Sequence, residues 1–365
     1  MRVLLTGGGT AGHINPAIAI ANYIKEKEEN SEFLFVGTER GLEKTLVPKC
    51  GYNIKFINVM GLRRSLSLQN FKVLYNYIKS FSDAKKIIKE FKPDVVIGTG
   101  GYVCASVVKT ASKMKIPTLI HEQNVFPGLA VKMLSNDADI TAISFSETRE
   151  MMKAKKMVET GNPLRPNLFK EIDKKALMEE CGFEDKKLVL IFGGSLGAPC
   201  INRALAEMLK DATDFNIIAS TGEKNYEDTM KHIKALGLDV EKMKNVKILP
   251  YLYNMEDVFG AADLIVGRAG AITVSEITAL GKAAILIPSP YVAHNHQEYN
   301  ARFLEKNGAA KVILENDLSG EVLLKCIKEI TGNEEAFKKM QTSSEKIGIK
   351  DSCEKIYSCI KALIK

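Results

Sequence analysis

The sequence predicts two tandem α/β domains, each built on a doubly wound parallel sheet of the Rossmann type. Three observations favour this fold class. The chain has 365 residues, more than a single hydrophobic core of ordinary size organises. Short β-branched apolar runs alternate with helical segments in both halves, which is typical of βαβ units. Four glycine-rich turns each follow such a run directly, at residues 7–12, 98–101, 193–197 and 267–270.

The first half contains six apolar runs that suit buried parallel strands. They lie at residues 2–6, 33–36, 54–59, 95–97, 118–121 and 140–143. Helices are expected between them at residues 16–27, 69–91, 104–113 and 127–135. The first helix is expected to begin at Pro16, with Asn15 as its N-cap, because proline is favoured at the first helical position. A segment with two prolines and a glycine, residues 161–166, predicts the linker, so the first domain spans 1–160.

The second half repeats the scheme, and its domain is expected at residues 161–340. Strands are predicted at 188–192, 216–220, 246–249, 264–266 and 284–288. The clearest helices are predicted at 198–210 and 270–280. Residues 333–365 have a charged, helical pattern.

The composition is that of an ordinary soluble protein, with 45% apolar and 26% charged residues. No apolar run approaches the roughly 18 residues of a membrane-spanning helix. The first strand reaches glycine too early for a secretory signal. The seven cysteines are odd in number and include no Cys-x-x-Cys pair, which argues against a disulfide framework or a zinc site. These features predict a reduced, cytoplasmic protein.

The positive charge is concentrated in one segment. Of the net charge of +7, residues 61–92 contribute +6, from eight Lys and Arg against two acidic residues. Such a patch indicates an anionic partner. An apolar series at i, i+3, i+4 and i+7 runs beside these cations: Phe71, Leu74, Tyr75 and Ile78. Either this helix lies on an anionic membrane surface, or its apolar stripe faces the core and its basic side is solvated.

The glycine turns predict a ligand that carries phosphate, because glycine lets the backbone approach it and helix N–H groups bind anions. The first turn satisfies G-x-G-x-x-G, the dinucleotide fingerprint. However, the second strand ends at Gly37, and the nearest acidic residue, Glu39, is poorly placed for a ribose, so a dinucleotide cofactor is disfavoured. His13 follows this turn at the expected carboxyl edge of the sheet, where it is either a loop histidine or a functional group.

The segment 263–301 holds the densest set of candidate binding groups. Glu276 falls in the second turn of a predicted helix that follows a buried strand and a glycine turn. It is either a solvated carboxylate or the acceptor of both ribose hydroxyls, with a diphosphate at the helix start. The neutral polar loop at 293–300 suits a sugar.

Two other patterns are interpreted as incidental. Asp137 and Asp139 match the D-x-D of metal-dependent sugar transferases, but acidic residues before an apolar strand usually mark a solvated helix end, so no metal site is expected. Ser195 lacks the G-x-S-x-G context of a hydrolase nucleophile and is better placed to donate to a phosphate.

Seven motifs together carry a specific resemblance, which extends from residue 2 to about residue 310. They are GGTAGH (8–13), GTGGY (98–102), HEQN (121–124) followed by PG (127–128), GNPLR (161–165), GGSLGA (193–198), RAGAITVSE (268–276), and HQ with NA (296–297 and 300–301). In this order they resemble the MurG family, the bacterial N-acetylglucosaminyltransferases of glycosyltransferase family 28.

The resemblance implies a GT-B fold, in which two Rossmann-like domains face each other across a cleft and residues 341–365 pack back on the first domain. It implies transfer of GlcNAc from UDP-GlcNAc to the C4 hydroxyl of MurNAc in lipid I, undecaprenyl-pyrophosphoryl-MurNAc-pentapeptide. The product is lipid II, with inversion at the sugar and without a cofactor, a metal or a nucleic-acid partner. The protein would then be peripheral on the cytoplasmic membrane face, with residues 61–92 against anionic lipid.

The resemblance also implies roles for individual residues. His13 is the expected catalytic base, with Glu122 and Asp94 as competitors. Four residues are expected to line the cleft from the first domain around it: Thr10, Ala11, Gly12 and Asn124. The expected donor-binding residues are Arg165, Ser195, Leu252, Ala271, Ile272, Thr273, Val274, Ser275, Glu276 and Gln297. Without a metal, Arg165 and helix N-termini would stabilise the departing UDP.

The sequence departs from the family pattern at two places. Leu196 stands where many relatives have glutamine, and residues 103–106 replace a common Ser-Gly-Pro, which leaves contacts there open. Two other classes also remain open at this point. A UDP-GlcNAc 2-epimerase shares the fold and the donor but needs no lipid surface, and a non-catalytic UDP-sugar sensor would bind the donor without turnover.

Overall fold

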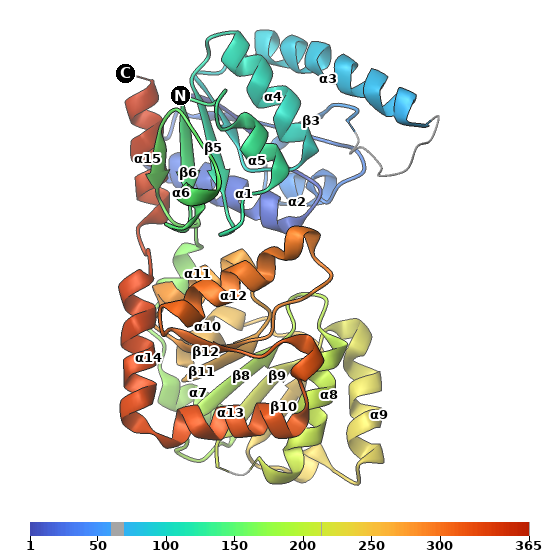
Figure 1. Ribbon diagram of the computed structural model, residues 1–365, viewed down its shortest axis with the longest axis vertical. Helices are drawn as coiled ribbons and strands as arrows, with labels where there is room; N and C mark the ends of the chain where they lie inside the picture. Colours follow the sequence, from blue (N-terminus) through green and yellow to red (C-terminus); the bar gives the residue numbers. More distant parts are fainter. Residues whose placement is uncertain (60–68, 213, 365) are drawn as a thin grey trace. The chain divides into compact units, whose positions relative to one another are not determined.

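The structure, a computed structural model, describes residues 1–59, 69–212 and 214–364, and for residues 69–74 the backbone only. The chain forms two compact units, residues Met1–Leu164 with Ile349–Lys365, and residues Arg165–Gly348 (Figure 1). The boundary after Leu164 lies inside the segment in which the linker was expected. The C-terminal segment differs from the expected 341–365, because residues up to Gly348 belong to the second unit and only Ile349–Lys365 belongs to the first.

The first unit contains a sheet of seven strands, all parallel, in the order β3-β2-β1-β4-β5-β6-β7. The strands are β1 (Arg2–Thr6), β2 (Glu32–Gly37), β3 (Asn53–Phe56), β4 (Val95–Gly98), β5 (Thr118–Glu122), β6 (Ile140–Ile143) and β7 (Met157–Glu159). Six of them were predicted. The edge strand β7 was missed because three residues are too few to show a period.

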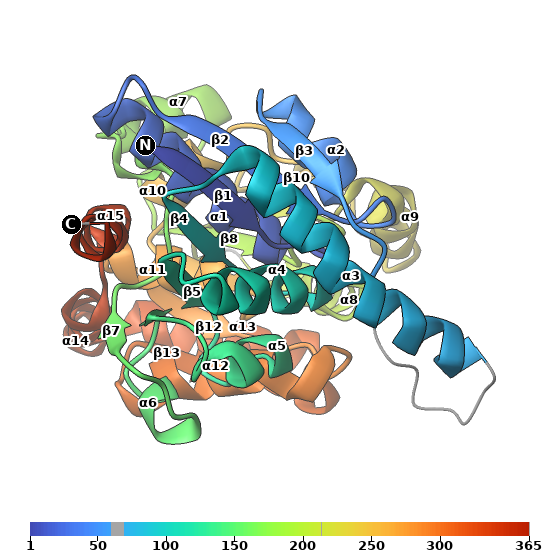
Figure 2. The ribbon, with the colours of Figure 1, turned by 90° about the horizontal axis from the view of Figure 1, so that it is seen from above.

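Helices cover both faces of this sheet: α1 (Ala11–Lys27), α2 (Glu43–Lys49), α3 (Gln69–Phe91), α4 (Tyr102–Lys113), α5 (Leu129–Leu134), α6 (Thr148–Met151) and α15 (Ser352–Leu363). On one face α1 packs with α15, and Ile14, Ile24, Ile356 and Ile360 share one buried cluster. On the other face α3, α4 and α5 bury a second cluster, and Figure 2 shows α3 running alongside α4.

The start of α1 differs from the prediction. The helix begins at Ala11 after Thr10, and Pro16 lies inside it rather than at its first position. Proline at this point removes a single backbone bond, to the Gly12 carbonyl. The buried series from Ile14 to Ile24 keeps the helix against the sheet along its whole length. Ala11, Gly12 and His13 are therefore the first helical residues, directly after the glycine turn.

The second unit contains a six-stranded parallel sheet in the order β10-β9-β8-β11-β12-β13. Its strands are β8 (Leu188–Phe192), β9 (Asn216–Ser220), β10 (Val246–Leu249), β11 (Leu264–Gly267), β12 (Ala283–Leu286) and β13 (Ala310–Val312). Its helices are α7 (Lys174–Cys181), α8 (Pro199–Met208), α9 (Tyr226–Ala235), α10 (Met255–Ala261), α11 (Ala271–Ala279), α12 (His296–Lys306), α13 (Gly320–Gly332) and α14 (Glu334–Ile347). Short 3₁₀ helices are η1 (Pro166–Phe169), η2 (Leu209–Asp211), η3 (Glu223–Asn225), η4 (Val240–Lys242), η5 (Ala293–Asn295) and η6 (Glu315–Asp317).

The four glycine turns occupy equivalent places in the two sheets. In each sheet the strand order reverses between two central neighbours, β1 and β4 in the first and β8 and β11 in the second. Ligands of open α/β sheets bind at the carboxyl ends of the strands at such a switch point. The turns at 7–12 and 98–101 follow β1 and β4, and those at 193–197 and 267–270 follow β8 and β11. Each unit therefore has its candidate site where its two glycine turns meet.

Candidate active site

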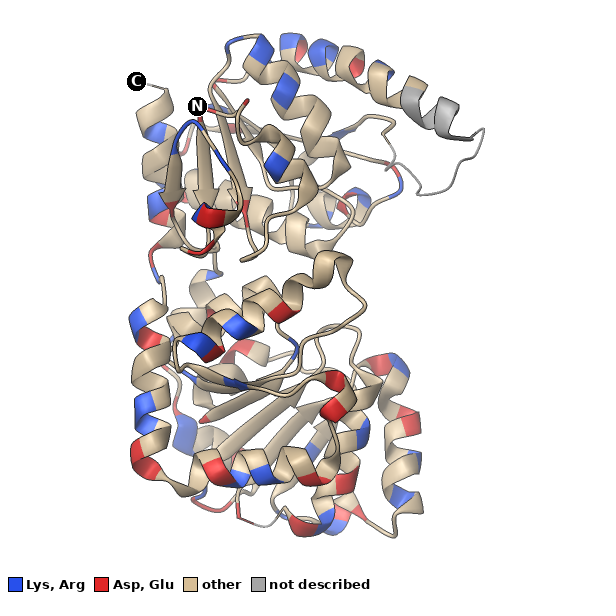
Figure 3. Cartoon of the chain, in the orientation of Figure 1, with Lys and Arg blue, Asp and Glu red and all other residues tan. Residues whose placement is uncertain are grey.

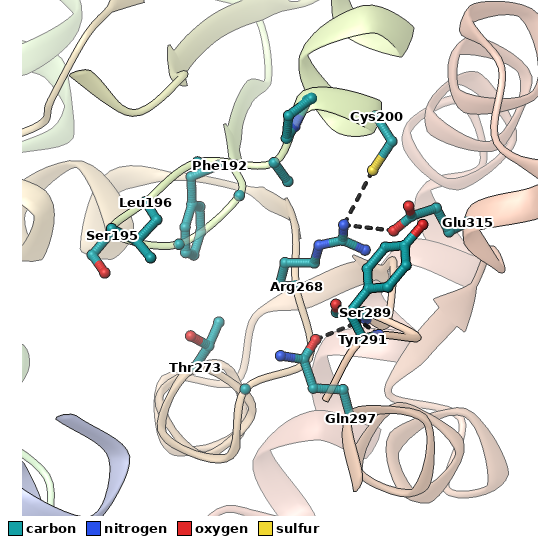
Figure 4. Close-up of a pocket in the computed structure, with 16 residues that line it drawn as sticks. Phe192, Ser195, Leu196, Cys200, Arg268, Thr273, Ser289, Tyr291, Gln297 and Glu315 are labelled. Atoms are coloured by element: carbon teal, nitrogen blue, oxygen red, sulfur yellow. Dashed lines mark hydrogen bonds and ion pairs between the residues drawn. The ribbon is translucent and has the colours of Figure 1, made fainter. Parts of the chain in front are cut away.

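A pocket of about 610 Å³ lies at the switch point of the second unit (Figure 4). It is lined by the turn after β8, the start of α8, the turn after β11, the first turn of α11, and the segments around Ser289 and Gln297. Of the expected donor-binding residues, Ser195, Thr273 and Gln297 line it. The remaining ones lie outside this lining.

The turn after β8 is held in shape by its neighbours, and Ser195 at its tip is exposed. Gly197 has a φ of +74°, and a side chain there would run into the Thr221 carbonyl, so only glycine fits. The Asn225 amide donates to the Leu196 carbonyl over 2.9 Å. The Leu196 side chain is 78% exposed, so it is available to a ligand only as an apolar group.

The start of α11 presents one side of its first turn to the pocket. Thr273 lines the pocket, whereas the side chains of Val274 and Ser275 are buried in the unit. Within the predicted binding run 271–276, Val274 and Ser275 can therefore offer a ligand only backbone groups. The fixed partial charge of the helix start favours an anion at this place.

Gln297 is oriented by a backbone contact. Its Oε1 accepts the Ser289 N–H over 2.9 Å, and Figure 4 shows the amide nitrogen turned toward the pocket. Asn300, fully buried, donates to the Ala269 carbonyl over 3.1 Å and so ties α12 to the turn after β11. Gln297 thus offers a hydrogen-bond donor to the pocket, and Asn300 holds α12 against the turn behind it.

Arg268 carries the only positive charge among the described residues that line the pocket. Its guanidinium donates to Glu315 over 2.6 Å, to the Ile287 carbonyl over 3.1 Å and to the Cys200 sulfur over 3.1 Å. Arg268 begins the motif at 268–276 but is not among the site residues expected from the sequence. Its position directly after β11 was the available signal, whereas Glu315, 47 residues further along the chain, gave none.

A second group of charges in this unit involves Arg165, the expected cation for the diphosphate. Arg165 lies 2.6 Å from a Glu256 oxygen and 3.9 Å from a Glu276 oxygen. The pKa of Glu276 is raised to about 7, chiefly because the carboxyl is buried; the charge of Arg165 lowers it and the charge of Glu256 raises it. Arg165 thus balances two carboxylates, one of which is the expected ribose acceptor. Leu252, another of the expected donor-binding residues, is buried, with 4% of its surface exposed.

In the first unit, the two glycine turns hold His13. Its Nδ1 lies 3.0 Å from the Gly8 carbonyl and 3.5 Å from Thr10 Oγ1. A carbonyl only accepts, so Nδ1 carries the proton and Nε2 is the basic nitrogen. The ring packs against Gly100, where a Cβ would lie 2.7 Å from it, and Thr99 donates to the His13 carbonyl over 2.6 Å.

The two alternative bases have other roles. Asp94 precedes β4 and accepts the Arg2 N–H over 2.7 Å, at the amino end of the sheet and away from the glycine turns, so its assignment as a competing base is wrong. Glu122 is buried and accepts the N–H groups of Asn124 and Gly128 over 2.9 and 2.8 Å. It shapes the loop that carries Asn124, and burial raises its pKa.

Asp137 and Asp139 have structural partners. Asp139 accepts the Thr118 N–H over 3.0 Å and its hydroxyl over 2.9 Å, which secures the start of β5. Lys109 lies 3.4 Å from Asp137, and Lys155 lies 3.4 Å from Asp139. These contacts account for both carboxylates.

Comparisons with known proteins agree with this architecture. Residues 3–143 match the glycosyltransferase family 28 N-terminal domain, and residues 188–356 match the family 28 C-terminal domain. A protein of Thermoanaerobacter sp. (strain X514) is 49% identical over 365 residues, all of both chains. One of Acetivibrio thermocellus is 48% identical over all of this chain and 99% of its own. Both are named UDP-N-acetylglucosamine--N-acetylmuramyl-(pentapeptide) pyrophosphoryl-undecaprenol N-acetylglucosamine transferase.

Solved structures give the same picture. The crystal structure of Acinetobacter baumannii MurG superimposes with a TM-score of 0.81 at 29% identity and 99% coverage of both chains. A UDP-GlcNAc 2-epimerase from Neisseria meningitidis, bound to UDP-GlcNAc, superimposes with a TM-score of 0.67 at 16% identity, covering 99% of this chain and 100% of its own. That second likeness is one of fold alone.

Two parallel Rossmann-like sheets, with a pocket at the switch point of the second, define an α/β enzyme of the GT-B class. The chain belongs to glycosyltransferase family 28.

Proposed function

We propose that this enzyme transfers GlcNAc from UDP-GlcNAc to the MurNAc unit of lipid I and so forms lipid II. The observation that carries the proposal is the 49% identity to a curated transferase of this name over the full length of both chains.

The second unit binds the donor. The diphosphate lies against the turn after β8 and the start of α11, where Ser195, the first-turn N–H groups and the Gln297 amide donate to it. Arg268 supplies positive charge beside it, and its pairing with Glu315 keeps the guanidinium in place. Glu276 accepts the ribose hydroxyls, and Arg165 stabilises its ionised form.

The first unit binds the acceptor and supplies the catalytic base. His13 Nε2 removes the proton from the C4 hydroxyl of MurNAc as the oxygen attacks the anomeric carbon from the face opposite UDP, which inverts that centre. Thr10, Ala11, Gly12 and Asn124 form the surface around it. The Gly8 carbonyl keeps the imidazole in the tautomer that this step needs.

No metal enters this mechanism. The negative charge that develops on the departing UDP is stabilised by helix N-termini and by Arg268, in place of the expected Arg165, which contacts Glu256 and Glu276. Asp137 and Asp139 pair with Lys109 and Lys155, and Asp139 also accepts the N–H at the start of β5. These contacts give both carboxylates a structural role.

One assay tests the activity. UDP release from UDP-GlcNAc is measured with and without a lipid I analogue, in the presence of EDTA, and the products are separated. Acceptor-dependent UDP release with formation of a disaccharide is expected, at an unchanged rate in EDTA. Conversion of UDP-GlcNAc to its 2-epimer without acceptor would identify the epimerase activity instead. Loss of turnover restored by magnesium or manganese would contradict the metal-free mechanism.

We also propose that the protein docks on the anionic cytoplasmic membrane face through residues 61–92, as a peripheral protein. Four lysines of α3 are exposed, Lys79, Lys85, Lys86 and Lys89, and Figure 3 shows basic residues spaced along this helix. Among the described helices, none is long and apolar enough to cross a membrane.

The exposed apolar groups of α3 support the membrane interpretation. Tyr75 and Ile78 are 66% and 65% exposed on the side that carries the lysines, while Ser80, Ala84 and Ile88 face the core. For these two residues the core-facing alternative is wrong. The other residues of the predicted surface, Arg63, Arg64, Phe71, Leu74 and Lys72, lie outside the described side chains.

Vesicle sedimentation tests the docking surface. Changing Lys79, Lys86 and Lys89 to Glu is expected to reduce sedimentation with anionic vesicles, since each cation contributes about 1 kcal/mol, and added salt should weaken wild-type binding. Turnover of a short-chain, water-soluble acceptor should persist. The matched control changes three exposed lysines of α14, Lys338, Lys339 and Lys346. An equal loss of vesicle sedimentation in both variants would contradict this docking surface, and so would unchanged sedimentation in both.

A further inference from the structure

Glu43, the first residue of α2, is a carboxylate with no exposed surface beside the first glycine turn. Among the described residues it accepts three hydrogen bonds. Its Oε2 accepts the Gly9 N–H over 2.9 Å, and its Oε1 accepts the Thr38 N–H over 2.9 Å and the Thr38 hydroxyl over 2.8 Å. A Cβ on Gly8 would lie 2.6 Å from Oε1, so the turn leaves room for the carboxylate only because glycine is there.

The bond from Gly9 connects Glu43 to His13 through a single peptide group. The N–H of Gly9 and the carbonyl of Gly8 belong to the same peptide plane and point in opposite directions. The N–H donates to Glu43, and the carbonyl accepts from His13 Nδ1 at 3.0 Å. A carboxylate that accepts from an N–H polarises the peptide and strengthens its carbonyl as an acceptor.

This peptide has an alternative orientation. Gly9 has a φ of +87°, which glycine adopts without strain, and no atom of the described residues beyond its chain neighbours lies within 4 Å of the place where a Cβ would stand, so no side chain at this position restricts rotation of the Gly8–Gly9 peptide. A flipped peptide would direct the Gly9 N–H at His13 Nδ1. That arrangement favours the Nε2–H tautomer, in which Nε2 cannot accept a proton.

We propose that Glu43 is a positioning residue for His13: it fixes the Gly8–Gly9 peptide so that the histidine is held as the Nδ1–H tautomer. Glu43 thus occupies the N–H that would meet a ligand phosphate in a nucleotide-binding turn. This explains why a turn with the G-x-G-x-x-G spacing serves a histidine and not a dinucleotide. The inference concerns the tautomer, and only its catalytic consequence rests on the proposed role of His13 as the base.

Glu43→Gln is the sharpest variant, because glutamine keeps the shape and has one acceptor oxygen. Thr38 offers that position two donors and Gly9 offers one, so the amide oxygen stays at Thr38 and the NH₂ group faces the Gly9 N–H. Two facing donors repel, and the peptide is expected to flip. Thr38→Val is the matched control, since it removes one bond to the same carboxylate and leaves the Gly9 bond intact.

Two measurements read the outcome. Nitrogen-15 NMR of the five histidines, with the His13 signals assigned by their loss in His13→Asn, distinguishes the protonated ring nitrogen. Wild type and Thr38→Val are expected to show Nδ1–H for His13, and Glu43→Gln to shift toward Nε2–H. Glu43→Gln should lower kcat on the lipid acceptor about 10-fold, the lower end of what hydrogen-bond partners of ligating histidines contribute. Its KM for UDP-GlcNAc should stay that of the wild type.

Three results would overturn the proposal: an unchanged His13 tautomer in Glu43→Gln, the same tautomer change in Thr38→Val, or an equal loss of kcat in both variants. Failure of the proposed function is distinguishable from these results. If His13 is not the base, the tautomer still shifts in Glu43→Gln while kcat does not change with it. Circular dichroism and the thermal midpoint establish that each variant is folded.

Discussion

The glycine turns after β1 and β8 arise from similar sequence patterns and are used in opposite ways. In the first unit a buried carboxylate, Glu43, takes the N–H of Gly9. In the second unit no carboxylate is bonded to the equivalent turn within the described residues, and Gly193, Gly194 and Ser195 line an open pocket. Both turns suit an anion, but in the first the Gly9 N–H already donates to Glu43.

A glycine fingerprint thus specifies backbone geometry and not the ligand. The group that accepts from the N–H donors of the turn determines whether the turn can bind a ligand. In the first unit that group comes from α2, so the turn becomes a rigid support for His13. In the second unit the proposed donor supplies that group, because the turn lines a pocket.

His13→Ala removes the group that the first turn supports, and it should have the largest effect. A general base contributes roughly 10²–10⁴-fold, so kcat should fall by that factor while UDP-GlcNAc affinity, measured by calorimetry, changes little. A variant that keeps a tenth or more of kcat would move the base elsewhere in the first unit.

Glu276→Ala tests the donor side of the comparison. Loss of charge-assisted hydrogen bonds to the ribose, worth about 1.5–3 kcal/mol, should raise the donor KM 10- to 100-fold. Glu256→Ala is the control, because Glu256 also contacts Arg165, and its KM should change less than about threefold if it makes no ligand contact. Equal effects would show that both act only through Arg165.

Donor affinity should also depend on pH through Glu276. Burial raises its pKa to about 7, so the carboxylate is present above pH 7 and is lost as the pH falls through that value. If UDP binds only the ionised form, the donor Kd should be about tenfold higher at pH 6 than at pH 8. Glu276→Gln should flatten this dependence. The same raised pKa favours the protonated folded state, so the glutamine variant should resist urea better than the wild type at pH 8, with the difference vanishing in acid.

A pair of glycine substitutions, one in the turn after β1 and one in the turn after β8, should have the smallest effect on catalysis. Gly9→Ala and Gly197→Ala both place a Cβ on a left-handed residue, at a cost of about 1–2 kcal/mol. Only at Gly197 does the Cβ also meet a backbone atom, the Thr221 carbonyl, which should add about 1–3 kcal/mol. Urea unfolding measures both. The donor KM should rise in Gly197→Ala alone, and a rise in Gly9→Ala would contradict the separation of roles.

Much of the fold was predictable because buried parallel strands are short continuous apolar runs. β6, β8, β9 and β10 begin and end at the predicted residues. The two missed strands, β7 and β13, are three-residue edge strands in which tertiary pairing decides the conformation and local pattern does not. The start of α1 was predicted wrongly at Pro16 for a similar reason, because burial along the helix outweighs the one backbone hydrogen bond that proline removes.

The site was predictable where a residue sits beside a glycine turn, as His13, Ser195 and Thr273 do. It was not predictable where a contact joins distant segments. Nothing near Glu43 in the sequence indicates that it meets Gly9, 34 residues away, and Glu315 gives no local sign of its pairing with Arg268. Such contacts follow from strand order, which local periodicity does not encode.

The return of the chain to the first unit has a consequence for synthesis on the ribosome. Ile356 and Ile360 of α15 complete the apolar cluster that α1 forms with the first sheet. These residues are translated after all of Arg165–Gly348. The unit that is made first is therefore finished last, and until then the α15 side of α1 is uncovered. A nascent chain would therefore expose this apolar surface after all of Arg165–Gly348 has been synthesised.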